Sequence, residues 1–470
     1  MRITLVTPPY NLLKEGYGTK MYSKYASYPP LGIGYIAAAL EKTSHKVKIV
    51  DSQAALLNNE QILSEIYKFG SDAVGISAVT ACANSACELA IFLKKKLNIP
   101  VIMGGPHPTC FPEAVYKKAK DIDLLVVGEG EETIKEIISV IDCKDRWKNI
   151  DGICFLDGDH NFIMTNRREP IDDLDKIEPP ARHLYNNEFY HPIPNLHLQL
   201  PATNMITSRG CPYAKCAFCY QAGRMKQRYR RHSPERIIGE IGNLVKQYGI
   251  KEVAFWDDNF IVSKDWIKKF CGLLIEKRLN LSWSCYSRVD MVSKEALDMV
   301  GRAGCWSIFY GLESGAQELL DIINKGITLE QSRSAVKWAH QAGIETRGSF
   351  MLALPGENPQ LAKKTIDFAI QLNLDSAQFL ATYPEYGTKL YDKAVGTGQF
   401  MDYKGRHAVT YVPEGYKSAG EVKKVIKNAY LRFYLRPSFF LKYIRRIKSW
   451  KDFLKYLEGF RMVLGIATHN

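Results

Sequence analysis

The first 142 residues alternate short apolar, β-branched runs with longer segments whose apolar positions recur at helical spacing. Short strands that alternate with helices form parallel sheets covered by helices on both faces. The pattern predicts strands at residues 2–7, 46–50, 73–78, 100–104 and 123–127, and helices near residues 31–42, 58–68, 83–97, 111–119 and 131–141. We therefore expect an α/β domain over residues 1–142, built as a doubly wound parallel sheet.

Small residues dominate the loops that follow these strands. The loops are TPPY at 7–10, DSQ at 51–53, SAVT at 77–80, GGPHPT at 104–109 and GEGEET at 128–133. Ligands of such sheets lie beyond the carboxyl ends of the strands, so the loops predict a broad floor for a large flat ligand. GEGEET holds only Gly-x-Gly, which supports a nicotinamide site poorly. His107 is the candidate metal ligand here, although a histidine between two prolines is more often a shaping or hydrogen-bonding residue.

The pattern changes between residues 143 and 200. The run GICFLDGDHNFIMT predicts a hairpin that turns at Asp157–Asp159, because Asp-Gly favours tight turns. A proline-rich stretch follows, with prolines at positions 170, 179, 180, 192 and 194. We interpret residues 143–200 as a connector that contains a hairpin.

A second alternation of strands and helices occupies residues 201–398. The predicted strands lie near residues 203–208, 251–256, 281–287, 306–311, 344–352 and 375–382. Amphipathic helices separate them, such as the one that begins after the predicted N-cap Ser233. Six strand-helix units in series predict a partial (β/α)6 barrel, in which functional residues gather at the carboxyl ends of the strands.

The last segment, residues 399–470, predicts a basic helical region in which aromatic residues alternate with lysine and arginine. The chain carries a net charge of +13, concentrated in this region and at residues 224–231. Such stretches can bind nucleic acid, anionic lipid or an acidic protein, but a solvated basic face is the more common role. This region is a candidate for peripheral membrane contact, and we expect no nucleic-acid partner.

Composition places the chain among ordinary globular proteins, with 46% hydrophobic and 24% charged residues in 470. No apolar run reaches the roughly 18 residues of a membrane span. Met1 leads directly into a predicted strand without a signal peptide. Eleven cysteines in a long chain of this kind fit a reducing compartment. We therefore expect a cytoplasmic, soluble protein.

Three cysteines lie within nine residues in the run SRGCPYAKCAFCY, directly after the first predicted strand of the barrel. A closed structural zinc site uses four protein ligands, usually in two pairs. Three thiolates that hold an iron-sulfur cluster instead leave one iron open to a further ligand. The alternatives are ordinary thiols in a turn and half of a zinc site completed from elsewhere in the chain. The flanking Gly210, Pro212 and Phe218 favour a shaped ligand loop.

In their order and spacing, these motifs resemble those of radical S-adenosylmethionine (SAM) enzymes that carry an N-terminal cobalamin-binding domain. The likeness covers nearly the whole chain. TPPY, PPLGIGYIAAAL, GGPHPT and GEGEET are similar to the cobalamin-domain motifs. SRGCPYAKCAFC, DDNF, GLESG with the downstream Lys325-Gly326, and ALPGE are similar to the barrel motifs.

The resemblance implies three sets of site residues. A four-iron four-sulfur cluster would be held by Cys211, Cys216 and Cys219, with SAM on its open iron. SAM would contact Asp257, Asp258, Arg288, Glu313 and Ser314. Cobalamin would contact Pro9, Ser77, Thr80, Gly104, Gly105, His107, Gly128, Glu129 and Gly130. Two of these have structural alternatives: Arg288 can pair with Asp290, and Glu313 can act as a capping or packing carboxylate.

The chain departs from the family pattern at three places. Four residues separate the first two cysteines, where the family usually has three. The Asp-x-His-x-x-Gly motif that supplies a cobalt ligand is absent, because Asp51 is followed by Ser52 and Gln53. We therefore expect no protein histidine on the lower face of the cobalt. Ala353 replaces a frequent glycine, a change that we expect to be tolerated.

The resemblance implies reductive cleavage of SAM to a 5'-deoxyadenosyl radical and methylation of an unactivated carbon from methylcobalamin. The substrate would be a small molecule, a lipid or a peptide, and a flavodoxin or ferredoxin would supply low-potential electrons. One alternative is oxidation or ring closure, as in the anaerobic cyclase of the magnesium-porphyrin pathway, whose layout the chain also resembles. Another is a cobalamin and iron-sulfur carrier or redox sensor. A tRNA methylthiotransferase is disfavoured, because Cys82, Cys87, Cys110, Cys143 and Cys154 are scattered and form no second triad.

Overall fold

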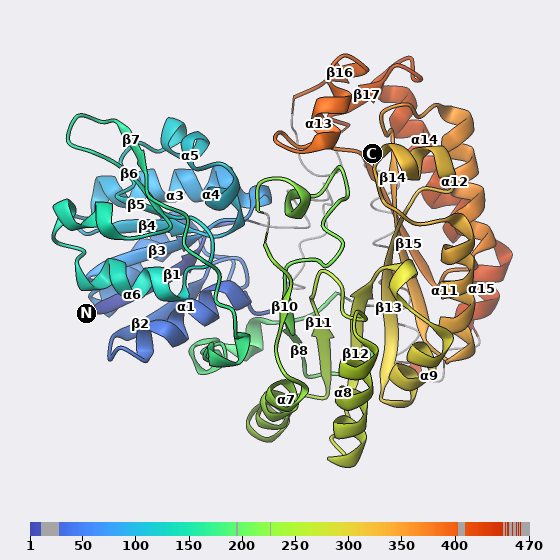
Figure 1. Cartoon of the computed structure of the whole chain (residues 1–470), viewed down its shortest axis with the longest axis horizontal. Coiled ribbons are helices and arrows are strands. Elements are labelled where there is room, and N and C mark those ends of the chain that lie inside the picture. The colour runs from blue at the N-terminus through green and yellow to red at the C-terminus, as the bar shows by residue number, and fades with distance from the viewer. Residues whose placement is uncertain are drawn as a thin grey trace. The chain divides into compact units, whose positions relative to one another are not determined.

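A computed structural model describes residues 1–10, 28–193, 196–225, 227–402 and 409–444, together with a few single positions beyond them. The chain divides into two compact units, of which the first ends at His191 and the second begins at Pro192. Each unit is built around its own sheet (Figure 1).

The first unit contains a seven-stranded sheet in the order β2-β1-β3-β4-β5-β6-β7. Its strands are β1 (Arg2–Thr7), β2 (Lys46–Asp51), β3 (Ala73–Ser77), β4 (Val101–Gly104), β5 (Leu124–Val126), β6 (Ile153–Leu156) and β7 (Phe162–Met164). The first five are parallel, as the sequence predicts. Their helices are α1 (Leu31–Glu41), α2 (Asn59–Phe69), α3 (Ala83–Lys96), α4 (Pro106–Cys110), α5 (Pro112–Lys118) and α6 (Glu131–Ser139).

Apolar side chains cover both faces of this sheet, which explains the nearly continuous apolar strands. Ile3 and Leu5 of β1 pack in one core cluster with residues of α1 and α6. Val6 belongs to a second cluster with residues of α2, α3 and α5. The doubly wound parallel fold predicted for this part of the chain is therefore confirmed.

The predicted hairpin adds two antiparallel strands to this sheet. Cys154 of β6 pairs with Leu125 of β5, and Met164 of β7 pairs with Cys154. Segment 143–191, which the proline-rich sequence marks as a connector, thus packs within the first unit. The short helix α4 was also not predicted, because five residues are too few for a helical period.

The second unit contains six parallel strands in the order β15-β14-β13-β12-β11-β8. The strands are β8 (Ala202–Met205), β11 (Glu252–Phe255), β12 (Ser282–Ser287), β13 (Cys305–Glu313), β14 (Glu345–Leu352) and β15 (Ser376–Ala381). Because β8 and β15 form opposite edges, the sheet is open, and the predicted partial barrel is confirmed.

Helices pack on one face of this sheet (Figure 1). They are α7 (Pro234–Tyr248), α8 (Lys264–Glu276), α9 (Lys294–Arg302), α10 (Gln317–Ile322), α11 (Leu329–Gln341) and α12 (Pro359–Gln371). Side-chain N-caps begin five of them: Ser233, Ser263, Ser293, Thr328 and Asn358. Strand residues such as Val253, Trp283 and Ile308 join the core against these helices. Alternate residues along the strands therefore face the inside of the open barrel.

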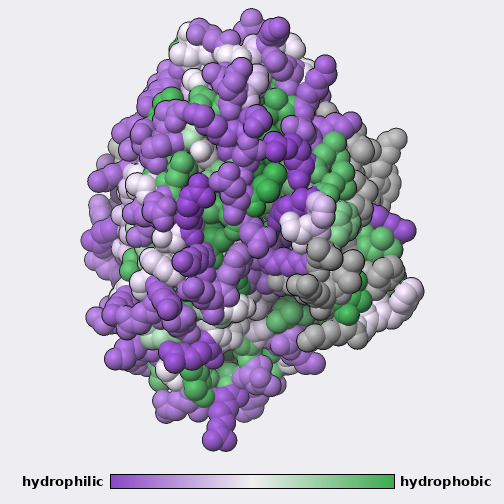
Figure 2. Space-filling view, turned by 90° about the vertical axis from the view of Figure 1, so that its right-hand side faces the viewer, coloured by the Kyte–Doolittle hydropathy of each residue, from purple (hydrophilic) through white to green (hydrophobic). Residues whose placement is uncertain are grey.

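The chain after the barrel forms α13 (Lys389–Ala394), a hairpin of β16 (Gly398–Phe400) and β17 (Tyr411–Pro413), and helices α14 (Ala419–Tyr434) and α15 (Pro437–Ile444). The Tyr434 hydroxyl of α14 accepts from the Ala377 amide of β15 and donates to the Ala377 carbonyl. The Tyr430 hydroxyl accepts from the Phe379 amide, so both tyrosines fix α14 to β15. The face turned to the viewer in Figure 2 is mainly hydrophilic, with small apolar patches. Within the described ranges, no helix is long and apolar enough to cross a bilayer.

Candidate functional site

The three cysteines lie on a loop between the short paired strands β9 (Ser208–Arg209) and β10 (Arg230–Arg231), directly after β8. Gly210 opens the loop with φ 80°, and a Cβ there would lie 2.8 Å from the Arg228 carbonyl oxygen. Cys216 is buried, whereas Cys211 and Cys219 are partly exposed. All eleven cysteines, each within the described residues, are free thiols.

The additional residue between Cys211 and Cys216 is absorbed by local backbone geometry. Ala214 adopts φ 41°, a left-handed conformation that turns the chain back. The Tyr213 hydroxyl donates to the Asn324 carbonyl at 2.9 Å, and the Asn324 amide donates to the Lys215 carbonyl at 2.9 Å. The longer spacing is therefore held against the segment that follows α10.

A buried arginine lies beside the cysteine loop. Arg288 Nη1 is 3.6 Å from Cys216 Sγ, and the guanidinium lies 3.8 Å from the centre of the Tyr213 ring. Its Nε and Nη2 donate to the two Asp290 carboxylate oxygens at 2.9 and 3.1 Å. Nη2 also donates to the Lys325 carbonyl at 2.7 Å. The ion pair between Arg288 and Asp290, which the sequence offered as an alternative role, is therefore present. One edge of the guanidinium still faces the Cys216 thiol.

Burial raises the pKa of the Cys216 thiol, while the nearby positive charges of Lys325 and Arg288 act in the opposite direction. Burial also raises the pKa of Cys219, to about 11. Thiols of this kind ionise when they bind a metal, because the metal displaces the proton. The two cations would then offset part of the negative charge of a thiolate-held cluster.

The donor set fits an iron-sulfur cluster. Among the residues that the structure describes, no three His, Cys, Asp or Glu side chains converge closely enough to hold a single metal ion. Ligands of a four-iron cluster bind separate irons, so they need not converge on one point. Three free thiols on one loop provide soft donors. The Phe218 ring on the same loop provides apolar cover, and Lys325 Nζ lies 5.6 Å from its centre.

A buried ion pair lies at the end of β13. Lys325 Nζ is 2.8 Å from Glu313 Oε1, and each side chain is only 8% exposed. Gly311 makes room for it, because a Cβ there would lie 2.5 Å from the carboxylate and 2.8 Å from Nζ. Glu313 adopts φ 62° beside a register shift between β13 and β14, a strained conformation typical of functional sites.

The two aspartates after β11 differ in their surroundings. Asp257 is buried and accepts hydrogen bonds from the Thr207 amide and hydroxyl at 3.0 and 2.8 Å and from the Ser208 hydroxyl. Asp258 is exposed and accepts one from Gln221 at 3.1 Å. Protein atoms packed around the Asp258 carboxyl reduce its local hydration, and this effect and the charge of Asp257 both raise the pKa of Asp258. Asp257 thus braces the start of the cysteine loop, and Asp258 keeps acceptor capacity.

Ser314 is fully buried and bonds within the protein. Its hydroxyl lies 3.1 Å from the Thr365 hydroxyl of α12 and accepts from the Ala316 amide at 3.1 Å. These contacts anchor the chain to α12 directly after Glu313, the last residue of β13.

Sequence reasoning did not assign roles to two residues near the loop. Lys325 was noted only within a motif, although its partner Glu313 was predicted. Asn259 is fully buried, and its carbonyl oxygen accepts from the Ser287 hydroxyl at 3.0 Å and the Arg288 amide at 3.1 Å. Its place in DDNF was a signal, but only its hydrogen bonds to the end of β12 show that it positions Arg288.

In the first unit, two of the small-residue loops are in close backbone contact. Gly105 has φ 108°, and a Cβ there would lie 2.8 Å from the Ala78 carbonyl oxygen. The Thr109 hydroxyl donates to the Gly105 carbonyl at 2.8 Å and accepts from the Gly128 amide at 3.0 Å. Gly128 has φ 92° and no atom within 4 Å of a Cβ position. The loops after β3, β4 and β5 thus form one connected floor.

The remaining predicted cobalamin residues lie at the ends of β3, β4 and β5 or on the loops that follow them, except Pro9, which follows β1. Burial lowers the pKa of His107 to about 4, so its imidazole is neutral at pH 7. Its Nδ1 lies 3.5 Å from the Thr80 hydroxyl. Glu129 accepts a hydrogen bond from the Ile171 amide at 3.1 Å. The positions at strand ends are Pro9 after β1, Ser77 in β3, Gly104 in β4 and Gly130 before α6. The residues of this floor are small and leave polar backbone groups accessible, which suits a broad corrin ring.

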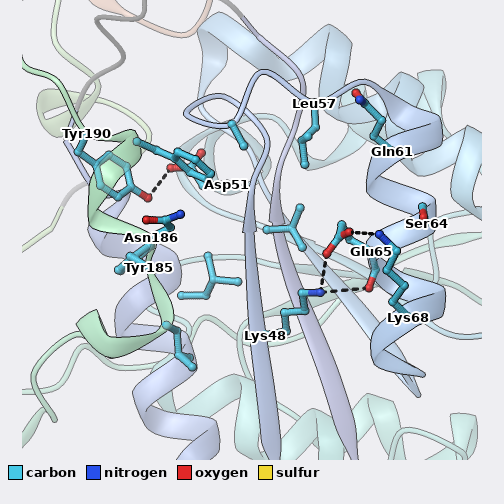
Figure 3. A pocket seen from close by; sticks show the side chains of 15 residues that line it. Lys48, Asp51, Leu57, Gln61, Ser64, Glu65, Lys68, Tyr185, Asn186 and Tyr190 are labelled. Carbon is cyan, nitrogen blue, oxygen red and sulfur yellow. Dashed lines mark hydrogen bonds and ion pairs between the residues drawn. The ribbon is translucent and has the colours of Figure 1, made fainter.

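A pocket of about 430 Å³ lies beside the edge strand β2, away from these loops along the sheet (Figure 3). At one end Tyr190 donates to Asp51 at 2.9 Å, and at the other Glu65 pairs with Lys48 and Lys68 at 2.7 and 2.8 Å. Asp51 also accepts from Thr7 at 2.8 Å. The pocket contains none of the predicted cobalamin residues.

Family models match both units. The model of the radical SAM superfamily matches residues 205–369, and that of the B12 binding domain matches residues 23–138. The open barrel with its cysteine loop and the doubly wound floor together define a radical SAM enzyme that carries a cobalamin-binding domain.

Comparison with individual proteins supports the same class. The chain is 34% identical to an uncharacterized methyltransferase of Pyrococcus horikoshii over 94% of both chains. It is 28% identical to the anaerobic magnesium-protoporphyrin IX monomethyl ester cyclase of Rubrivivax gelatinosus, over 92% of this chain and 78% of that one. The cobalamin-dependent radical SAM enzyme OxsB shares the fold, with TM-score 0.75 and 17% identity over 99% of this chain and 71% of that one. This chain belongs to the cobalamin-dependent radical SAM family.

Proposed function

We propose that this enzyme is a cobalamin-dependent radical SAM methyltransferase that acts on an unactivated carbon of a small-molecule, lipid or peptide substrate. The observation that supports this best is the three-thiol loop at the carboxyl end of β8, with Arg288 3.6 Å from one thiol. The small-residue floor of the first unit supplies a place for the corrinoid. Relatives named as methyltransferases favour methylation as the outcome.

The bound groups would supply an electron to the SAM sulfonium from the cluster and a methyl group from the corrinoid. The chain's part is to hold and orient them. Cys211, Cys216 and Cys219 are the cluster ligands in this proposal. Asp257 braces the loop that carries them through Thr207 and Ser208.

Charged groups around the loop match the charges of SAM. Asp258 has free acceptor capacity for the methionine ammonium. Lys325 and Arg288 are the nearby cations for its carboxylate, and Glu313 can accept from a ribose hydroxyl. Ser314, which directly follows Glu313, orients it through hydrogen bonds to Thr365 and to the Ala316 amide. These roles predict that the Glu313–Lys325 pair opens or shifts when SAM binds, since each of its partners then gains a second contact.

The cobalamin proposal assigns the floor to the loops after β1, β3, β4 and β5. His107 contacts the ligand as a neutral imidazole that is fixed by Thr80 and Phe111, whose ring centre is 5.3 Å away. We do not assign it as a cobalt ligand, because the chain lacks the Asp-x-His-x-x-Gly motif that supplies such a histidine. The lower face of the cobalt would then have no protein ligand.

Anaerobic reconstitution of the full chain tests this proposal. The protein should bind about four irons and one corrinoid, with the absorption and electron paramagnetic resonance spectra of both groups. With SAM and a strong reductant it should form 5'-deoxyadenosine, and with substrate also S-adenosylhomocysteine. Tightly bound zinc in place of iron, or a cluster whose spectrum does not respond to SAM, would contradict it.

Oxidation or ring closure is the second candidate, favoured by similarity to the cyclases over 92% and 94% of this chain. The same cofactors would serve both reactions. Formation of 5'-deoxyadenosine without S-adenosylhomocysteine or a methylated product would support this candidate and contradict methyl transfer.

We also propose two partners. A flavodoxin or ferredoxin would supply low-potential electrons to the cluster. The C-terminal region would contact a membrane surface or an extended substrate, since Leu435 and Phe440 are 47% and 40% exposed among its basic residues. Binding to anionic vesicles that declines with added salt would support the surface contact.

A further inference from the structure

One row of side chains crosses the inner face of the open barrel. Arg347 of β14 is in register with Phe309 of β13, which is in register with Tyr286 of β12. Trp256 continues the row, because it lies two residues beyond the register pair of Ala254 and Ser284, as Tyr286 does. Residues in register on parallel strands point to the same face.

The residues on the other face of the same strands show that the row lies on the inner face of the barrel. Phe255, Cys285 and Ile308 alternate with the row and pack in the core that includes the helices. The rings also touch: Tyr286 and Phe309 have centroids 5.2 Å apart, and the Arg347 guanidinium is 5.8 Å from the Phe309 ring.

Exposure falls along the row from one end to the other. Trp256 and Tyr286 are 42% and 38% exposed, Phe309 is partly buried, and Arg347 is 8% exposed. A molecule that enters beside Trp256 would therefore meet aromatic faces first and a buried cation last. The row spans three steps between neighbouring strands, or about 14 Å.

Among the residues that the structure describes, none is a counter-ion of this buried cation. Its Nε has no hydrogen-bond partner, and no described residue forms an ion pair with the guanidinium. The carboxylate of Glu252 does face the same side, but it accepts from two backbone amides at 2.7 Å, from Ser282 and from Trp306. A charge that is largely withdrawn from water without a partner is unfavourable in free energy, and a bound anion would offset this penalty.

We propose that this row, Trp256, Tyr286, Phe309 and Arg347, binds the substrate, and that the substrate is a flat or elongated apolar molecule with an acidic group. The aromatic side chains stack on its body. Arg347 pairs with its carboxylate or phosphate, for which a planar guanidinium is suited. This inference rests on the proposed function for the reaction that the substrate undergoes, and it adds a separate claim about how the substrate is recognised.

A matched pair of probes tests it: 1-pyrenebutyrate and its uncharged amide, which share the apolar body and differ in charge. Equilibrium dialysis against reconstituted full-length enzyme gives both affinities, with and without SAM. We expect the acid to bind about 10- to 100-fold more tightly than the amide. Arg347→Gln should abolish this preference, and Arg347→Lys should keep part of it. The exposed Arg302→Gln, on α9, removes the same net charge and should change nothing.

Two further measurements separate the alternatives. Arg347→Gln should raise the melting temperature, because it removes an unpaired buried charge, and SAM binding should be unchanged. Equal affinity for acid and amide in the wild type, or a preference that survives Arg347→Gln, would overturn the proposal. So would loss of SAM binding in that variant, since the arginine would then serve the SAM carboxylate. A wild type that shows the preference but never cleaves SAM would contradict the proposed function and leave the anion site intact.

Discussion

The candidate sites of the two units are built in different ways. In the first, the site is made of backbone: Gly105 and Gly128 hold positive φ angles, and Thr109 ties their loops together. In the second, it is made of charged side chains taken out of water, such as the pair Glu313 and Lys325, each 8% exposed. The first arrangement offers breadth and small residues, whereas the second offers charge at defined points.

This difference teaches what each ligand requires. A corrin ring is large and buries much area, so a broad floor of mainly small residues suits it. The methionine end of SAM carries an ammonium, a carboxylate and a sulfonium, so its orientation depends on opposite charges in a site of low dielectric. Substitutions should therefore act by shape in the first unit and by charge in the second.

The largest effect should follow from removing a thiol ligand. Cys216→Ser should lower 5'-deoxyadenosine formation at least about 100-fold, because loss of a ligand exceeds the effect of disturbing its neighbours. Corrinoid binding, measured by absorption, should remain. The exposed Cys143→Ser serves as the control and should keep a full cluster. Loss of both cofactors in Cys216→Ser would show that the two sites are not independent.

Next in size should be the effect of breaking the buried ion pair. Glu313→Gln should lower the free energy of unfolding by about 3–5 kcal/mol, because it leaves the Lys325 charge buried without a partner. The double variant with Lys325→Met should recover part of the loss. The comparison is sharpened by the exposed pair Lys264 and Glu295, where Glu295→Gln should change stability little. Denaturant unfolding measures all three.

A smaller effect should depend on pH. Burial raises the pKa of Glu357 to about 7, from an ordinary 4.5, although Tyr416 and Ala353 donate to it at 2.6 Å. The folded state thus holds a proton that the unfolded chain releases above pH 4.5. The stability contributed by this proton is complete below that pH and is lost as the pH rises through about 7.

Glu357→Gln should remove this dependence. The variant should equal the wild type in stability near pH 4.5 and exceed it by up to about 3 kcal/mol at pH 8. The amide oxygen can keep both donors, since they bond the same carboxylate oxygen, and the other oxygen has no partner. Unfolding free energies at the two pH values test this. A parallel pH profile for both proteins would show that the carboxyl is ionised in the fold.

The smallest effect should come from the floor. Gly105→Ala should destabilise the protein by about 1–3 kcal/mol and weaken corrinoid binding, because the Cβ meets the Ala78 carbonyl. Gly32→Ala in α1 is the matched control: no atom lies within 4 Å of its Cβ position, so it should be neutral or slightly stabilising. Equal effects of the two substitutions on corrinoid binding would indicate that shape is not what the floor provides.

Much of the fold was predictable because its signals are local. Strands of the first unit begin and end within one or two residues of the predicted positions, since apolar runs bounded by Gly and Pro are strong markers. The hairpin at Asp157 was predicted, but its attachment to β5 was not, because strand pairing over such a distance is set by packing of the segment as a whole. Gln399 to Pro413 likewise carried no sign of a second hairpin.

The candidate site divides in the same way. Cys211, Cys216 and Cys219 were found from spacing alone, since one loop carries them. Asp257 carried the same sequence signal as Asp258, yet it is the buried brace of the two. Arg347 had no signal at all, because its neighbours in sequence face the other side of the sheet.

The sequence by itself determined the order of the elements, the three thiols and the small residues of the floor, because helical and strand periods and loop composition are properties of neighbouring residues. The tertiary structure decided which charges have partners and which side chains share a face. Glu313 meets Lys325 across 12 residues, and Trp256 and Arg347 join one row from strands far apart in the chain. Strand register and burial create these relations, and both exist only once the helices pack against the sheet.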